Sequence, residues 1–193
     1  RESRRRESFF RSRQSYVCSD AHELGIRTDT ADLIYSNLTL PWCADPDRVF
    51  AELCRVLKPG GLLALSTLGP DTLRELRTFW RQVDEHEHVH VFIDMHDVGD
   101  ALVRAGFIDV VMDTEVITLQ YQCIDALFAD LKKLGAGNLS PGRRRTLSGR
   151  GKLTQLRTLY GETAPINATM EVTYAHAWTP LQKGSKIPLV ELG

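Results

Sequence analysis

The sequence predicts an α/β fold with a mostly parallel sheet, from three observations within one continuous stretch. The first is a short apolar run over 32–36 that ends in the polar pair Ser36-Asn37, as a buried parallel strand does where it opens into a site. The second is a helix signal over 45–57, and the third is another apolar run over 61–68. Because two buried strands joined by a helix form a parallel crossover, these strands are expected in one sheet.

The helix between these two runs has its own start and stop signals. Asp45 can cap it by accepting a hydrogen bond in the first turn, and Pro46 suits the first helical position. Lys58-Pro59-Gly60-Gly61 combines proline with glycine and ends the helix. The apolar residues fall on one helical face, as in a helix that packs on a sheet: Val49, Phe50, Leu53, Val56 and Leu57.

The same patterns predict the elements that follow along the chain. An amphipathic helix begins at Pro70, and Asp94 can cap a second helix that Gly106 ends. Residues 108–121 are rich in Val, Ile and Thr, which favours a strand. We expect two further helices, around 124–134 and 153–160, and a closing strand over 168–178.

Composition is typical of one globular domain. The chain has 193 residues, 25% of them charged and 42% hydrophobic, and no apolar run reaches the roughly 18 residues needed to cross a membrane. The four cysteines lack paired metal spacing, so we interpret them as free thiols in a reducing compartment. His86, His88 and His90 would share one face of an extended segment, which makes a zinc site conceivable. We favour a solvated surface loop there and expect no metal.

Longer motifs resemble a known family. Residues 32–38, Trp42 and the segment Arg55-Val56-Leu57-Lys58-Pro59-Gly60-Gly61 resemble strands four and five of a class I methyltransferase, a class that uses S-adenosylmethionine (SAM). Four further segments resemble, more specifically, the malonyl-acyl-carrier-protein O-methyltransferases of biotin synthesis: Ser66–Leu73, Phe92–Asp100, Ala105–Phe107 and Tyr174–Trp178. The resemblance extends from about Tyr16 to Pro180.

This resemblance implies a Rossmann-like, mostly parallel sheet with helices on both faces and a helical insertion before the last strand. We expect a domain over 1–180, an insertion at about 123–164 and a C-terminal tail over 181–193. The implied reaction is SAM-dependent methyl transfer to the free carboxylate of a malonyl thioester, carried by acyl carrier protein or by coenzyme A. The implied enzyme is cytoplasmic and monomeric, without a nucleic-acid or membrane partner.

The resemblance also implies where the cofactor lies. Residues 16–18 resemble the family's third strand, and Asp20 after it would lie beside the adenine, whose exocyclic amine a carboxylate can bind; a capping or surface role is the alternative. Asn37 ends a strand where open α/β sheets place ligands. Trp42 would contact cofactor or substrate, with core packing as the alternative. The expected cofactor-binding residues are Asp20, Ala21, Asn37, Leu38 and Trp42.

Two features of such a cofactor site do not occur in the sequence before Tyr16. One is a glycine-rich turn, whose backbone approaches the cofactor closely; Gly25 is the first glycine in the chain. The other is an acidic residue at the end of the second strand. The sequence therefore looks like a family member that is truncated at its N-terminus, or one that has lost its cofactor affinity.

The expected insertion is strongly basic. Residues 131–161 contain Lys and Arg but no acidic residue. A solvated face, nucleic-acid binding and an acidic protein partner are the alternatives; no aromatic residues interleave for nucleic-acid stacking, and acyl carrier proteins are acidic, so we favour the third. One arginine of the triplet at 143–145 would hold the malonyl carboxylate through paired hydrogen bonds. The expected substrate- and carrier-binding residues are Lys132, Lys133, Arg143, Arg144, Arg145 and Arg150.

No catalytic residue is assigned, because a malonyl carboxylate is already ionised near neutral pH and needs no general base. Two alternatives remain at this point. One is a methyltransferase-fold protein-arginine hydroxylase of respiratory complex I assembly, which would be mitochondrial. The other is a degenerate, non-catalytic family member that binds an acidic partner.

Overall fold

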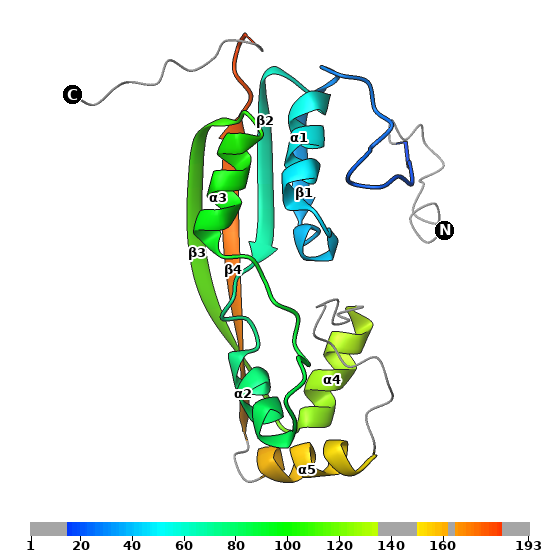
Figure 1. Cartoon of the computed structure of the whole chain (residues 1–193), viewed down its shortest axis with the longest axis vertical. Helices are drawn as coiled ribbons and strands as arrows, with labels where there is room; N and C mark the ends of the chain where they lie inside the picture. Colours follow the sequence, from blue (N-terminus) through cyan, green and yellow to red (C-terminus); the bar gives the residue numbers. More distant parts are fainter. Residues whose placement is uncertain (1–14, 135–149, 162–164, 183–193) are drawn as a thin grey trace, which may run out of the picture.

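The computed structural model describes residues 15–134, 150–161 and 165–182 (Figure 1). Its strands are β1 (Ala31–Asn37), β2 (Leu57–Leu68), β3 (Ile108–Tyr121) and β4 (Ile166–Trp178). The helices are α1 (Pro46–Val56), α2 (Arg74–Val83), α3 (Met95–Arg104), α4 (Ile124–Lys133) and α5 (Arg150–Gly161), with the short 3-10 helix η2 (Leu40–Trp42). Within this part of the chain, no helix is both long enough and apolar enough to span a membrane.

The four described strands form one mixed sheet in the order β1-β2-β4-β3. The crossover through α1 makes β1 and β2 parallel, as the sequence predicts. β4 returns between β2 and β3 and runs antiparallel to both. The prediction of a mostly parallel sheet is therefore wrong for the described strands, because the crossover through α1 determines only the β1–β2 pair and both pairings of β4 are antiparallel.

The capping signals of the β1-α1-β2 unit are confirmed. The Asp45 side chain accepts a hydrogen bond from the Arg48 amide at 3.1 Å, and Pro46 occupies the first turn of α1. At the other end of the helix, β2 begins at once with Leu57. The proline-glycine segment lies inside the start of β2, where the register to β1 shifts by a bulge and Gly60 adopts a positive φ of 73°.

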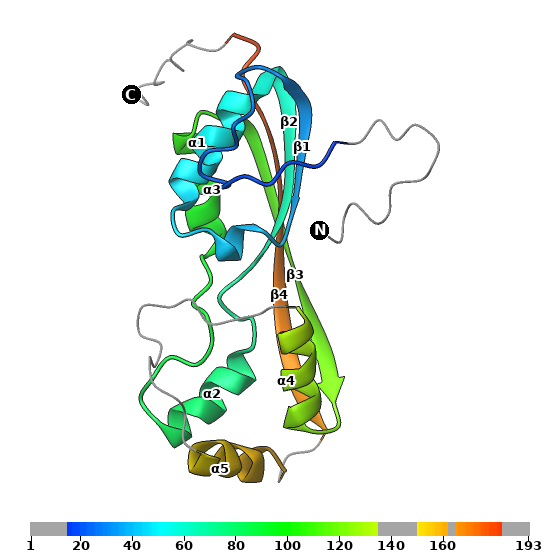
Figure 2. The same cartoon turned by 90° about the vertical axis from the view of Figure 1, so that its right-hand side faces the viewer.

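The first hydrophobic core lies between the sheet and helices α1 and α3, which cover the same face (Figure 2). Phe50 of α1, Leu102 of α3 and Phe107 are almost completely buried in it. Strand alternation supplies the other half of this core, because Leu63 and Leu65 of β2 point toward the helices. This core therefore fixes the carboxyl ends of β1 and β2.

A second core lies at the far end of the molecule, where α2, α4 and α5 gather around the lower part of β4 (Figure 1). We call these three helices the cap. Ile166 and Ala168 of β4 pack in the cap core, whereas Ala175 and Ala177 pack in the first core. Because alternate residues of a strand point to opposite faces, helices contact both faces of β4, but at different ends of the strand.

β1 forms one edge of the sheet, and its outward side chains are exposed. Leu33 is 57% and Tyr35 71% exposed, on the face opposite to α1 and α3. The predicted strand over residues 16–18 is not formed: this segment has no regular structure, and Val17 is 76% exposed. A strand needs a neighbour to satisfy its backbone groups, and no described strand pairs with this segment.

Candidate functional site

A cavity of about 660 Å³ lies between the carboxyl ends of β1 and β2 and the cap. Leu38 and Trp42 line it on the sheet side, and Trp80 of α2 lines it from the cap. Phe128 and Lys132 of α4 form another wall. Most of the lining is apolar, which suits a largely apolar ligand with few polar groups.

The sheet side of the cavity is built by a tight turn after β1. The Ser66 hydroxyl donates to the side-chain carbonyl of Asn37 at 2.5 Å, which ties the ends of the two parallel strands together. Leu38 then adopts a positive φ of 51°, and its amide donates to the Ser66 carbonyl at 2.9 Å. This left-handed residue turns the chain into η2, which brings Trp42 to the cavity with 44% of its surface exposed.

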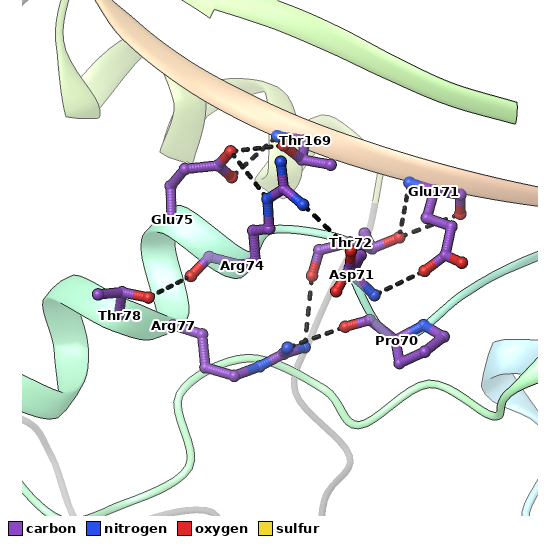
Figure 3. A network of polar contacts seen from close by, with 9 residues as sticks. All are labelled: Pro70, Asp71, Thr72, Arg74, Glu75, Arg77, Thr78, Thr169 and Glu171. Atoms are coloured by element: carbon purple, nitrogen blue, oxygen red, sulfur yellow. Dashed lines mark hydrogen bonds and ion pairs between the residues drawn. The ribbon is translucent and has the colours of Figure 1, made fainter.

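The cap wall is attached to β4 by a polar network (Figure 3). Glu75 of α2 accepts hydrogen bonds from the Thr169 hydroxyl at 2.5 Å and from the Thr169 amide at 3.0 Å. Burial alone would raise the pKa of Glu75, but these hydrogen bonds outweigh burial and lower it. A carboxylate therefore holds α2 against the sheet at the position where the two halves of the molecule meet.

The loop before α2 is held by the same strand. The Glu171 carboxylate of β4 accepts a hydrogen bond from the Asp71 amide at 2.6 Å (Figure 3). The Thr72 hydroxyl donates to the Glu171 backbone carbonyl and accepts from the Glu171 amide, each at 3.1 Å. The Arg77 guanidinium closes the loop by donating to the Pro70 carbonyl at 2.9 Å. Thr72 is fully buried and lines the cavity, so this network fixes part of the cavity wall.

A second buried polar group ties α5 to the cavity. The Asp84 side chain is only 7% exposed and accepts hydrogen bonds from His88 Nε2 at 2.7 Å and Lys152 Nζ at 2.9 Å. Burial alone would raise the pKa of Asp84, but the hydrogen bonds from Lys152 and His88 lower it well below its usual range. The His88 ring also stacks on Trp80, with ring centroids 3.7 Å apart.

His90 is the remaining imidazole of the cavity wall. The backbone carbonyl of Pro41 in η2 and the Glu87 carboxylate act to raise the pKa of this ring. Its Nδ1 atom is buried and has no hydrogen-bond partner among the described residues. Burial lowers the pKa of His90, which leaves the ring neutral at pH 7.

The structure separates the expected cofactor-binding residues into two groups. Leu38 and Trp42 line the cavity, and Asn37 lies beside them at the end of β1. Asp20 does not line the cavity. Its carboxylate accepts hydrogen bonds from the backbone amide of His22 at 2.9 Å and from the His22 ring Nδ1 at 2.6 Å. The last of the group, Ala21, packs against the first core.

The expected substrate- and carrier-binding residues are also separated. Lys132 is exposed and lines the cavity at the surface, whereas Lys133 forms an ion pair with Asp130 at 3.0 Å. Arg143, Arg144 and Arg145 lie outside the described residues, as does the side chain of Arg150.

Sequence reasoning missed the polar residues of the loop between α2 and α3. Asp84 and His88 were placed in a solvated surface loop, yet their side chains are 7% and 10% exposed. The prediction is wrong for these two residues, because Lys152 of α5, far away in the sequence, contacts Asp84. Glu85, His86 and Glu87 of the same loop are exposed, as predicted. Apolar Val89 among the histidines, which is 6% exposed, was the available signal. Over the residues that the structure describes, no group of three or more His, Cys, Asp or Glu could hold a metal ion.

Comparisons with known proteins agree with this architecture. Residues 1–65 match the family model described as a methyltransferase domain. The YcgJ protein of Bacillus subtilis has a solved structure that superimposes with a TM-score of 0.55, at 14% identity, covering 84% of this chain and 69% of that one. The chain therefore has the fold of the class I SAM-dependent methyltransferases.

Sequence relatives narrow this assignment. A protein of Methylovorus sp. named malonyl-[acyl-carrier protein] O-methyltransferase is 48% identical over 171 residues, 87% of this chain and 58% of its own length. A protein of the same name from Gallionella capsiferriformans is 46% identical and is covered over 59% of its length. The chain is thus a homologue of proteins with this name, and it spans somewhat more than half of their length.

Proposed function

We propose that the protein transfers a methyl group from SAM to the free carboxylate of a malonyl thioester on acyl carrier protein or coenzyme A, an early step of biotin synthesis in the cytoplasm. The observation that carries this proposal is the 48% identity over 87% of the chain to a relative of that name. The shape and chemistry of the cavity support it, because the cavity is apolar and meets the carboxyl ends of two parallel strands.

The residues at the sheet end fit part of a SAM site. The Asn37 amide lies at the end of β1, and Leu38 and Trp42 give an apolar wall next to it. SAM would supply an electrophilic methyl group on a sulfonium. In this arrangement the cavity wall keeps water away from the acceptor and restricts its orientation, which is the contribution that a reaction without a general base requires.

The position of Lys132 indicates how the substrate is oriented in the cavity. Lys132 lies at the exposed end of the α4 wall, whereas Leu38 and Trp42 lie at the sheet end. If the carboxylate of the thioester lies at the sheet end, the carrier therefore lies at the exposed end, beside α4. We assign Lys132 to the carrier side, where a cation attracts an acidic carrier protein or a phosphate group. The prediction that one of Arg143, Arg144 and Arg145 holds the carboxylate concerns residues outside the described part and stays a prediction.

The test is transfer of a labelled methyl group by the full-length protein. Malonyl-acyl carrier protein and malonyl-coenzyme A are compared with the acetyl thioesters, which lack the free carboxylate. We expect base-labile label only on the malonyl thioesters. Titration with S-adenosylhomocysteine, by calorimetry, is run on the same protein. A full-length protein that binds S-adenosylhomocysteine yet labels no malonyl thioester would exclude the proposed function.

A further inference from the structure

The cap presents two stacked rings to the cavity. Trp80 of α2 and His88 of the loop between α2 and α3 both line it. Their ring centroids lie 3.7 Å apart and their planes differ by 8°, so the two rings are nearly parallel. Trp80 is 7% exposed, and the side chain of His88 is 10% exposed. The pair is therefore a flat and mostly buried part of the cap wall.

A buried carboxylate fixes the orientation of the His88 ring. His88 Nε2 lies 2.7 Å from the Asp84 carboxylate, which also accepts a hydrogen bond from Lys152 Nζ at 2.9 Å. Because an ionised carboxylate can only accept hydrogen bonds, Nε2 carries a proton. In the neutral ring the lone pair is then on Nδ1. Asp84 therefore determines which nitrogen of His88 can accept a hydrogen bond.

Nδ1 is the ring nitrogen that remains for a ligand. It has no hydrogen-bond partner among the described residues, and it is not one of their buried side-chain atoms that lack a partner. It is therefore accessible, in a ring that lines the cavity. His90 of the same wall differs, because its Nδ1 is buried. A ligand group that donates one hydrogen bond would match His88 Nδ1.

The cavity is larger than the acyl group of the substrate. The malonyl group is small, whereas the cavity of about 660 Å³ extends from the ends of β1 and β2 to the cap. When the carboxylate lies at the sheet end, the chain that follows the thioester sulfur therefore lies along the cap wall. In acyl carrier protein and in coenzyme A this chain is the pantetheine arm, which consists of methylene groups and secondary amides. An apolar wall with one hydrogen-bond acceptor suits such a chain.

We propose that His88 Nδ1 accepts a hydrogen bond from an amide N–H of the pantetheine arm, and that the methylene groups of the arm lie against Trp80. This proposal rests on the proposed function, since it names the residues that recognise the thioester. The hydrogen bond aligns the arm before the methyl group is transferred, because Asp84 and the stacking on Trp80 hold the His88 ring in place. His88 is thus a residue that positions and selects the substrate, and the transfer itself needs no proton from it.

The test compares two small thioesters on the full-length protein. Malonyl-N-acetylcysteamine has an amide N–H at the place where the pantetheine arm has one, and the malonyl thioester of 2-mercaptoethyl acetate has an ester oxygen instead. The two substrates therefore differ in one hydrogen-bond donor and share the malonyl carboxylate. Methyl transfer is measured at pH 8, where an ordinary histidine is neutral.

Two variants complete the comparison. His88→Gln keeps an N–H donor for Asp84 but removes Nδ1. His86→Gln is the matched control, because it lies on the same loop, is exposed and does not line the cavity. Both variants are also assayed with malonyl-acyl carrier protein and malonyl-coenzyme A, which share the amide but differ in the carrier.

We expect the wild type and His86→Gln to prefer the amide thioester about tenfold in kcat/KM, equivalent to about 1.4 kcal/mol. His88→Gln should lose this preference through slower use of the amide thioester alone, and should lose about tenfold with both carriers. An equal loss on both small thioesters, or a loss with one carrier only, would overturn the proposal. So would a wild type without the preference, even if His88→Gln failed to fold. Failure of the proposed function is distinct, because the wild type then methylates no malonyl thioester.

Discussion

Replacing Asp84 should selectively destabilise the cap. Asp84→Ala leaves the His88 ring without its acceptor and Lys152 without its ion-pair partner. Breaking a buried pair on one side costs about 3–5 kcal/mol. Since Lys152 is 35% exposed and can regain water, we expect the lower end, about 3 kcal/mol. For a domain of this size that lowers the melting temperature by about 6–12 °C.

A second ion pair of α5, the helix that carries Lys152, gives a matched control. Asp125 and Arg157 form an ion pair of 2.7 Å between α4 and α5, but both side chains are about half exposed. Exposed pairs contribute about 0–1 kcal/mol. Asp125→Ala should therefore leave stability nearly unchanged, although it removes the same kind of contact from α5.

The pH dependence tests the cause of the effect. The pKa of Asp84 is lowered in the folded protein, so its contribution to stability is complete above the unfolded value of about 4 and is lost as the pH falls further. Urea unfolding of wild type and Asp84→Ala should differ most at pH 6–8 and converge in acid. A difference at pH 7 no larger than that of Asp125→Ala would refute the reasoning.

Three further outcomes are expected. Lys132→Met should raise the KM for malonyl-acyl carrier protein several-fold and weaken its salt dependence, whereas Lys133→Met should change neither by as much. Gly69→Ala should cost about 1 kcal/mol by denaturation, because its Cβ would lie 2.4 Å from the Glu171 carboxyl carbon and displace that side chain. Glu52→Gln should cost about 1 kcal/mol at pH 7 but little near pH 2, since hydrogen bonds from its arginine partner lower the pKa of Glu52 to about 2.

Local signals predicted the elements well, because they depend on neighbours in sequence. Asp45, Pro46 and the apolar stripe of α1 act within one helix, and all are found where the sequence places them. Leu38 and Trp42 both line the cavity beyond the end of β1, and their binding of cofactor or substrate, which the family resemblance implies, stays a prediction.

Long-range contacts were not predictable in the same way. The burial of Asp84 depends on Lys152, which is 68 residues away and arrives through a different helix. Residues 16–18 carry strand-like side chains, but a strand also needs a partner, which a pattern within one segment cannot supply.

The length of β3 and β4 decides how the molecule can move. Their pairing continues without interruption from Met112–Ala175 in the first core to Tyr121–Ile166 in the cap core. Bending at the middle would break ladder hydrogen bonds in a ribbon that both cores clamp, so the two ends cannot close on a substrate like hinged domains. Entry and exit must instead use local displacement of the segments that border the cavity, among them the loop between α2 and α3.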